Sequence, residues 1–132
     1  MSIEKMIRHW QDGSDKNFDD MIAIFGAQRY DWALYVGHLC LEKLFKALLI
    51  RRTENITVPF THNLVKLALK CGVELTEQQA STLNKINSFC IEAKYADDKR
   101  EFYLKCTREF ADEQIKIIKE QRKWIMNELA KN

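Results

Sequence analysis

A nearly continuous apolar stretch, LCLEKLFKALLI at residues 39–50, lies near the middle of the chain. Together with its flanks it predicts a helix over about 32–52 whose apolar side chains cover almost the whole circumference. Such a helix has to be surrounded by other elements, because no side of it is polar enough to face water. We therefore expect it to form the centre of the fold.

The elements that surround it are also predicted to be helices. Apolar residues recur at spacings of three and four, strict alternation is absent, and the chain has one proline and four glycines. The predicted segments are 3–10 and 14–26, joined or separated near Gly13, followed by 61–72, 76–93 and 107–129. Residues 94–103, KYADDKREFY, are expected to be a charged, aromatic connection. This pattern predicts an all-α, up-and-down helical bundle of about five helices, in a single domain over residues 1–132.

Helix boundaries follow from capping residues. The residues expected to cap helix N-termini are Ser14, Asp31, Thr61 and Thr76, the last within the capping box TEQQ at 76–79. Gly72 is expected just after a helix C-terminus, where a left-handed backbone conformation favours glycine.

Composition and charge narrow the classes of function. With 21 basic and 19 acidic residues the net charge is only +2, so any nucleic-acid binding requires a local patch. No apolar segment is long enough for a membrane span and no signal peptide is evident, so we expect a cytoplasmic protein. We expect no metal site and no cofactor. Four cysteines, expected to be buried reduced thiols, lie in apolar helical contexts: Cys40, Cys71, Cys90 and Cys106.

Ionisable side chains form a stripe on the most apolar helix. His38, Glu42 and Lys46 are spaced four residues apart and therefore share one helix face, while Lys43 is expected to point outward. One interpretation is an ordinary surface pair between Glu42 and Lys46, with His38 hydrogen-bonded in the core. The other is a polar network that lines a cleft or a dimer seam, because a buried charge costs several kcal/mol unless it is partnered.

Three motifs, taken in order along the chain, resemble the HEPN domain family. They are EKLFKA at 42–47, His-Asn-Leu at 62–64 and KYAD at 94–97. In the last motif Lys94 stands where the family has arginine, and Ala96 where it has proline. The resemblance covers nearly the whole chain.

The resemblance implies a compact helical bundle that commonly forms dimers and is often encoded beside a minimal nucleotidyltransferase. It also implies one of two kinds of activity. Some family members are metal-independent ribonucleases that use an Arg-x4–6-His motif, and others bind nucleotides or RNA or serve as partner subunits.

The ribonuclease motif is absent from this sequence. None of the three histidines follows an arginine at the required spacing, the pairs being Arg8–His9, Arg29–His38 and Arg52–His62. A general acid or base of near-neutral pKa typically contributes about 10²- to 10⁴-fold to a rate, so its absence disfavours the usual nuclease mechanism. His62 and Arg100 remain candidates for a catalytic pair assembled in space.

Three functions stay open at this point. The first is a nucleotide- or RNA-binding module that acts with a nucleotidyltransferase in a toxin–antitoxin-like system, with ligand contacts from His38, Glu42, Lys43, Lys46, Lys94, Tyr95, Arg100 and Tyr103. The second is an endoribonuclease toxin with a different Arg/His site. The third is a structural dimerisation module. An expected excess of exposed aromatic residues favours a homodimer: Trp10, Phe18, Tyr30, Trp32 and Tyr35.

Overall fold

The computed structural model of the chain describes residues 2–131, with the side chains of 96–98 excepted, and this part is helical without any strand. The helices are α1 (Ile3–Gly26), α2 (Tyr30–Thr53), α3 (Leu64–Lys70), α4 (Glu77–Lys94), α5 (Ala96–Lys105) and α6 (Arg108–Ala130). The predicted all-α bundle is confirmed. It contains one helix more than the sequence indicated.

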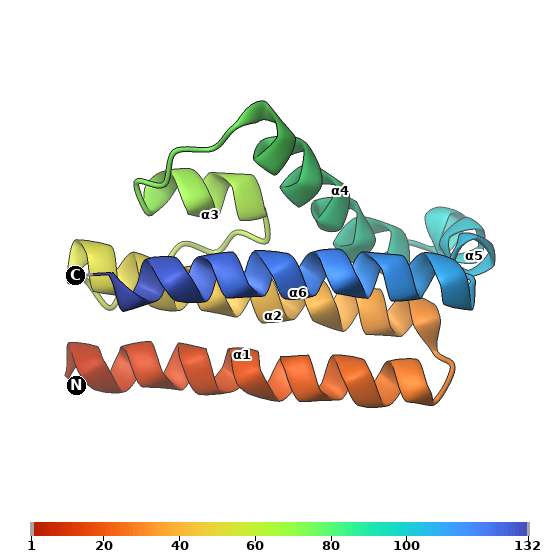
Figure 1. The fold of residues 1–132 in the computed structure, drawn as a ribbon, viewed down its shortest axis with the longest axis horizontal. Coiled ribbons are helices and arrows are strands. Elements are labelled where there is room, and N and C mark those ends of the chain that lie inside the picture. The colour runs from red at the N-terminus through yellow and green to blue at the C-terminus, as the bar shows by residue number, and fades with distance from the viewer. Residues whose placement is uncertain (1, 132) are drawn as a thin grey trace.

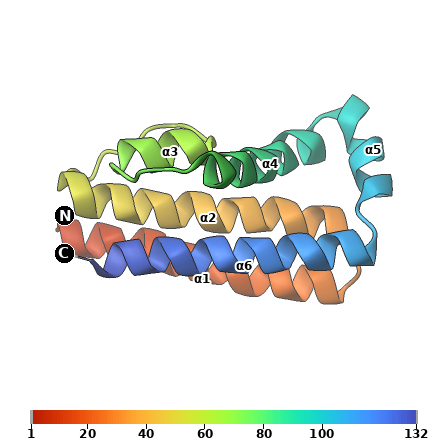
Figure 2. The same cartoon turned by 45° about the horizontal axis from the view of Figure 1, so that its top comes forward.

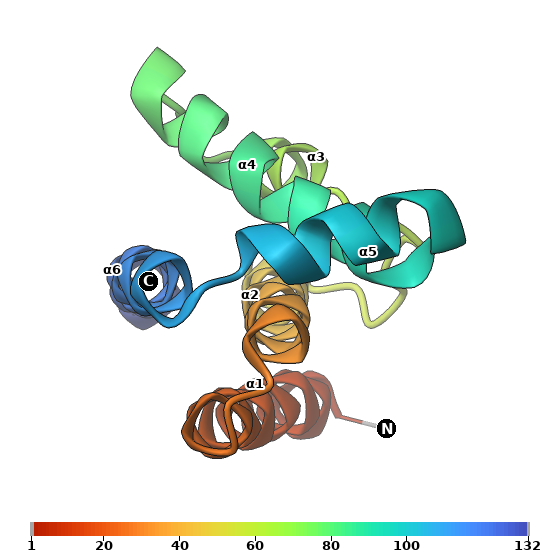
Figure 3. The same cartoon turned by 90° about the vertical axis from the view of Figure 1, so that its right-hand side faces the viewer.

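The helix α2 lies at the centre of the bundle. Viewed from the end, α1 and α6 pack on two of its sides and α3 with α4 on a third, while α5 crosses one end (Figure 3). The helix α1 runs antiparallel to α2, whereas α6 runs in the same direction as α2 (Figure 1). Both chain ends therefore lie at the same end of the molecule (Figure 2).

The burial of α2 explains its central position. Its side chains are buried along most of its length, including Leu34, Leu41, Leu44, Phe45 and Leu48. Close packing is also visible at Gly37, where an added Cβ would lie 2.7 Å from Ile118 Cδ1 of α6 and 2.9 Å from Met21 Sδ of α1. The predicted role of the apolar stretch is confirmed.

The first helix is continuous, so the prediction that Ser14 caps a second helix is wrong. Ser14 is buried in the middle of α1, and its hydroxyl donates to the carbonyl oxygen of Cys40 in α2 at 2.7 Å. Gly13 does not interrupt the helix. It makes room for Lys43, whose Cδ would lie 3.3 Å from an added Cβ. The side chain of Lys43 is thus half-buried against α1 rather than pointing outward.

Two other predicted caps are also wrong, and two capping signals are confirmed. Asp31 lies in the first turn of α2 rather than at its N-cap. Asn63 caps α3 in place of Thr61, whose hydroxyl accepts a hydrogen bond from the Asn63 backbone. The capping box at Thr76 is present, and Gly72 has a φ of 77° after α3.

The predicted connection at 94–103 is largely the helix α5. Phe102 is its buried anchor, and the Phe102 ring stacks on Phe89 of α4 with centroids 5.7 Å apart. The large apolar residues of α5, Phe102, Tyr103 and Leu104, are consecutive in sequence and give no helical spacing, which explains why the helix was missed.

The exposed apolar surface lies elsewhere than predicted. Trp10, Phe18, Tyr30 and Tyr35 are partly buried against the core, and only Trp32 of the predicted set remains 40% exposed. A further group of exposed apolar side chains belongs to α4, α5 and the residue between them: Ile91, Tyr95, Tyr103 and Leu104.

The four cysteines are free and buried, as expected. None of the helices formed by the described residues has the length and apolar character needed to cross a membrane.

Candidate functional site

Glu42 is the centre of a buried polar network on α2. Its Oε1 accepts a hydrogen bond from His62 Nδ1 at 2.7 Å, and its Oε2 accepts one from Lys46 Nζ at 2.9 Å. Glu42 and Lys46 are only 5% and 7% exposed. The stripe predicted from the four-residue spacing is therefore a partnered interior network and not an ordinary surface ion pair.

His38 is fully buried and contacts the loop before α3, to which His62 belongs, through the backbone of His62. Its Nε2 lies 2.7 Å from the carbonyl oxygen of His62, which can only accept a hydrogen bond, so Nε2 carries the proton. The Nδ1 of His38 lies 3.9 Å from Glu42 Oε1 and makes no hydrogen bond. The backbone and the ring of His62 are thus both attached to α2.

Burial and hydrogen bonding set the charge states within this network. Burial acts to raise the pKa of Glu42, but hydrogen bonds from His62 and Lys46 outweigh it and lower that pKa below its usual value. Burial lowers the pKa of His38, against the opposing effect of the Glu42 charge. At neutral pH the network therefore contains a carboxylate and a neutral His38.

The contact with Glu42 also orients the imidazole of His62. Because a carboxylate oxygen accepts, Nδ1 of His62 donates, and Nε2 is left on the opposite edge of the ring. The His62 side chain is 61% exposed. A buried carboxylate thus holds an exposed imidazole in one orientation.

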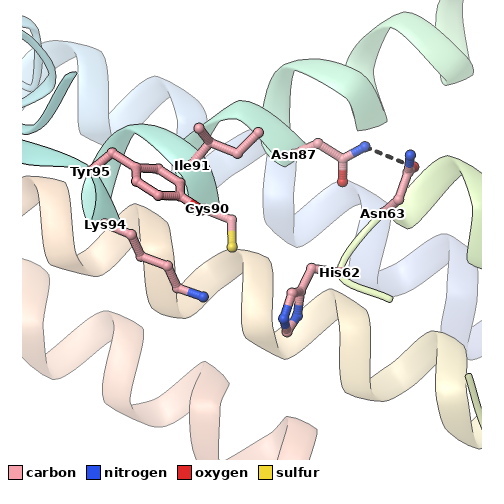
Figure 4. A pocket seen from close by; sticks show the side chains of 7 residues that line it. All are labelled: His62, Asn63, Asn87, Cys90, Ile91, Lys94 and Tyr95. Carbon is pink, nitrogen blue, oxygen red and sulfur yellow. Dashed lines mark hydrogen bonds between the residues drawn. The ribbon is translucent and has the colours of Figure 1, made fainter. Parts of the chain in front are cut away.

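His62 faces a cleft of about 210 Å³ between the loop before α3 and one face of α4. The cleft is lined by His62, Asn63, Asn87, Cys90, Ile91, Lys94 and Tyr95. Figure 4 shows the ammonium end of Lys94 and the ring of His62 directed toward the same space, with the sulfur of Cys90 between them. The Lys94 ammonium also lies 5.4 Å from the centre of the Tyr35 ring on α2.

Asn87 fixes the loop to α4. Its Oδ1 accepts a hydrogen bond from the Leu64 backbone at 2.8 Å, and its Nδ2 donates to Asn63 Oδ1 at 3.1 Å. These bonds occupy Asn87, so it positions the cleft wall. Burial raises the pKa of Cys90, so its thiol is protonated at neutral pH and is a poor nucleophile.

Apart from Lys43, which packs against α1, the predicted site residues fall into two groups. His38, Glu42, Lys46 and His62 form the network beside the cleft, and Lys94 and Tyr95 line that cleft. Arg100 and Tyr103 instead line another recess, together with Asp31 and Lys99. The Lys46 ammonium is turned toward Glu42 and the Trp10 ring, at 5.2 Å from the ring centre, rather than toward solvent.

The sequence interpretation missed four of the cleft residues: Asn63, Asn87, Cys90 and Ile91. A signal for three of them was present, because 87, 90, 91, 94 and 95 follow the spacing of one helix face. Of the three, only Cys90 entered the sequence analysis, as a buried thiol. No group of three or more potential metal-ligating side chains occurs in the part of the chain that the structure describes.

Comparison with known proteins decides the family. Residues 7–129 match the profile of the HEPN domain. The chain belongs to the HEPN domain family. The crystal structure of TT1696 from Thermus thermophilus has the same fold, with a TM-score of 0.77 and 18% sequence identity, over 92% of this chain and 97% of that one. No curated protein matches the sequence.

Two of the three motifs that resemble the HEPN family build the network. Glu42 and Lys46 come from EKLFKA, and His62 comes from His-Asn-Leu. In this HEPN domain the two motifs therefore act together: the first orients the second at the edge of the cleft.

Acidification is expected to destabilise this HEPN domain partly through His38. Its folded-state pKa lies below the usual 6.5, so below about that pH the unfolded chain takes up a proton that the folded protein does not. Stability contributed by neutral His38 is present above that pH and is lost as pH falls. Glu42 stays ionised in this range because its pKa lies below 4.5.

Urea unfolding at about pH 7.5 and about pH 5.5 measures this effect. We expect a smaller loss of stability on acidification in His38→Gln than in the wild type. His9→Gln, at an exposed histidine of α1, is the matched control and is expected to keep the wild-type loss. An unchanged pH dependence in His38→Gln would contradict the assignment.

Proposed function

We propose that this protein is a nucleotide- or RNA-binding HEPN module whose ligand binds in the cleft beside His62. The observation that carries the proposal is the meeting of Lys94, His62 and Tyr95 in one recess. A cation beside an aromatic ring is the combination that binds a phosphate and stacks a base.

The dimensions of the cleft support a small ligand group. Its volume of about 210 Å³ is below the roughly 300–1,000 Å³ of sites that enclose a drug-sized molecule. One base or one phosphate group therefore enters, and the rest of a nucleotide lies along the surface. Tyr95 is 62% exposed and offers a ring face for stacking. Ile91 adds an apolar side chain to the lining of the cleft.

A second recess, on α5, offers contacts of the same kind for a longer ligand. Arg100 and Tyr103 line it together with Asp31, and the Lys99 ammonium lies 5.5 Å from the centre of the Trp32 ring. Basic and aromatic side chains thus occur both at the end of α4 and on α5. Their presence on both helices supports RNA as well as a single nucleotide as the ligand.

Replacing Tyr95 by alanine is the experiment that tests the proposal. Loss of a stacked base is expected to weaken binding by about 1–3 kcal/mol, which is roughly 5- to 150-fold in the dissociation constant. Titration calorimetry with ribonucleotides and short RNA at low salt measures it, because electrostatic contacts are strongest there.

Phe60→Ala is the matched control, since Phe60 is a fully exposed aromatic residue outside the lining of the cleft. It is expected to bind like the wild type. The proposal is refuted if the wild type binds neither nucleotides nor RNA at low salt, or if Tyr95→Ala binds as tightly as the wild type.

We propose further that the domain acts in the cytoplasm as a homodimer, with a minimal nucleotidyltransferase as partner in a toxin–antitoxin-like system. The exposed apolar side chains of α4 and α5, Ile91, Tyr103 and Leu104, support a surface that another chain covers. Sedimentation over a range of concentrations tests the homodimer. Copurification with the product of a neighbouring nucleotidyltransferase gene tests the partner.

The alternative endoribonuclease function has one observation in its favour. The Glu42–His62 pair holds an imidazole whose Nε2 faces the cleft, which is a suitable arrangement for a general base. Arg100, its expected companion, lines the other recess. RNA cleavage in a metal chelator that is lost in His62→Gln would favour this alternative over simple binding.

A further inference from the structure

The cleft beside His62 is lined by basic groups without an acidic one. Its two ionisable nitrogen groups are the imidazole of His62 and the ammonium of Lys94, and none of its lining residues is an aspartate or glutamate. An anion that enters therefore meets the positive charge of Lys94 and no carboxylate in the wall.

Glu42, the carboxylate of the network, is not among the residues that line the cleft. Each of its oxygens has a partner at 2.9 Å or less, in His62 and Lys46, and the residue is 5% exposed. Its charge is therefore balanced inside the protein. It can orient His62 toward a ligand without itself facing that ligand.

The geometry leaves Nε2 of His62 as the ring atom available to a ligand. Phosphate oxygens accept hydrogen bonds, so Nε2 carries a proton in a phosphate complex. That proton comes from solvent together with a phosphate dianion, or from a singly protonated phosphate. Lys94 supplies the second charged donor from α4.

We infer that the cleft recognises a terminal phosphate monoester of a nucleotide, held between His62 and Lys94. This inference rests on the proposed function and specifies its ligand. A monoester carries about −1.5 to −2 charges at pH 7, whereas an internal phosphodiester carries one. Two basic donors and no carboxylate in the lining match the monoester better than a nucleoside or a diester.

The shape of the cleft agrees with a terminal group. The cleft is a shallow recess of about 210 Å³ whose walls are the loop before α3 and one face of α4. A phosphate at the end of a chain enters such a recess with one substituent. An internal phosphate carries two substituents, and both have to pass through the single opening of the recess.

Titration calorimetry at low salt tests the inference with three probes that share each base: the ribonucleoside 5′-monophosphate, the nucleoside and the 3′,5′-cyclic phosphodiester. We expect the monophosphate to bind at least about tenfold more tightly than either of the others. In His62→Gln and in Lys94→Gln this preference is expected to fall severalfold, because the loss of affinity is larger for the monophosphate than for the nucleoside.

Lys123→Gln is the matched control, because Lys123 is an exposed lysine on α6, which contributes no residue to the cleft. It is expected to keep the wild-type preference. Lys94→Gln guards against a folding defect in His62→Gln, since the Lys94 side chain is exposed and lies outside the buried network of Glu42.

The outcomes separate the inference from the proposed function. If wild-type protein binds nucleoside and cyclic diester as tightly as monophosphate, the inference is overturned and nucleotide binding stands. If Lys94→Gln keeps the full preference, the phosphate lies elsewhere and the inference is also overturned. If no probe or short RNA binds at all, the proposed function itself fails.

Discussion

The variant Glu42→Ala is expected to lose about 3–5 kcal/mol of unfolding free energy. Removing this carboxylate leaves the Lys46 ammonium, which is 7% exposed, without its partner in the core. An unpaired buried charge costs far more than the net value of the pair. The same change releases His62, whose ring then loses its fixed orientation.

Asp20→Ala is the matched control for this prediction. Lys16 and Asp20 form an i, i+4 pair at 3.0 Å, close to the 2.9 Å of Lys46 and Glu42, but their side chains are 77% and 42% exposed. Because surface pairs contribute a few tenths of a kcal/mol, this variant is expected to lose less than about 0.5 kcal/mol. Urea unfolding at neutral pH compares the two.

A second comparison tests the cause. Lys46→Met in the Glu42→Ala background removes the unpaired charge, so the double variant is expected to be more stable than Glu42→Ala alone. Equal losses in Glu42→Ala and Asp20→Ala would show that the network contributes no more than a surface pair does.

The variant Phe102→Ala is expected to lose about 3–5 kcal/mol as well, through a different mechanism. The side chain of Phe102 is almost fully buried and stacks on Phe89. It is the buried apolar anchor of α5, so its truncation leaves a cavity and removes the main contact that holds this helix against α4.

Hydrogen exchange of the α5 amides, together with urea unfolding, measures this effect. We expect faster exchange over Ala96–Lys105 than over α2 in Phe102→Ala. Leu104→Ala, two residues further along the same helix, is the control, because Leu104 is exposed and is expected to change stability by less than about 0.5 kcal/mol. Similar losses in both variants would contradict the anchoring role of Phe102.

Glu42→Ala acts on the network between the core and the cleft, and Phe102→Ala acts on the contact between α4 and α5. Glu42 connects the core to the cleft directly, since one carboxylate both neutralises a buried lysine and orients a cleft imidazole. A bundle with an apolar residue at this position would avoid the cost of desolvating a charge. The presence of the network is therefore best explained by the position it gives to His62.

Patterns of local origin were readable from the sequence alone. The central place of α2 follows from apolar residues around its whole circumference, and the capping box at Thr76 follows from hydrogen bonds that span three residues. Residues four apart lie on the same face of a helix, so the pairing of Glu42 with Lys46 was also predictable.

Only the tertiary structure decided which distant groups meet. Ser14 is hydrogen-bonded to Cys40, and His38 and Glu42 are hydrogen-bonded to His62. The ring of Phe102 stacks on that of Phe89. The sequence also could not predict that Arg100 lines a different recess from His62. Periodicity and capping report interactions within one helix, whereas these contacts depend on how helices pack, and packing is set by all the side chains of the core together.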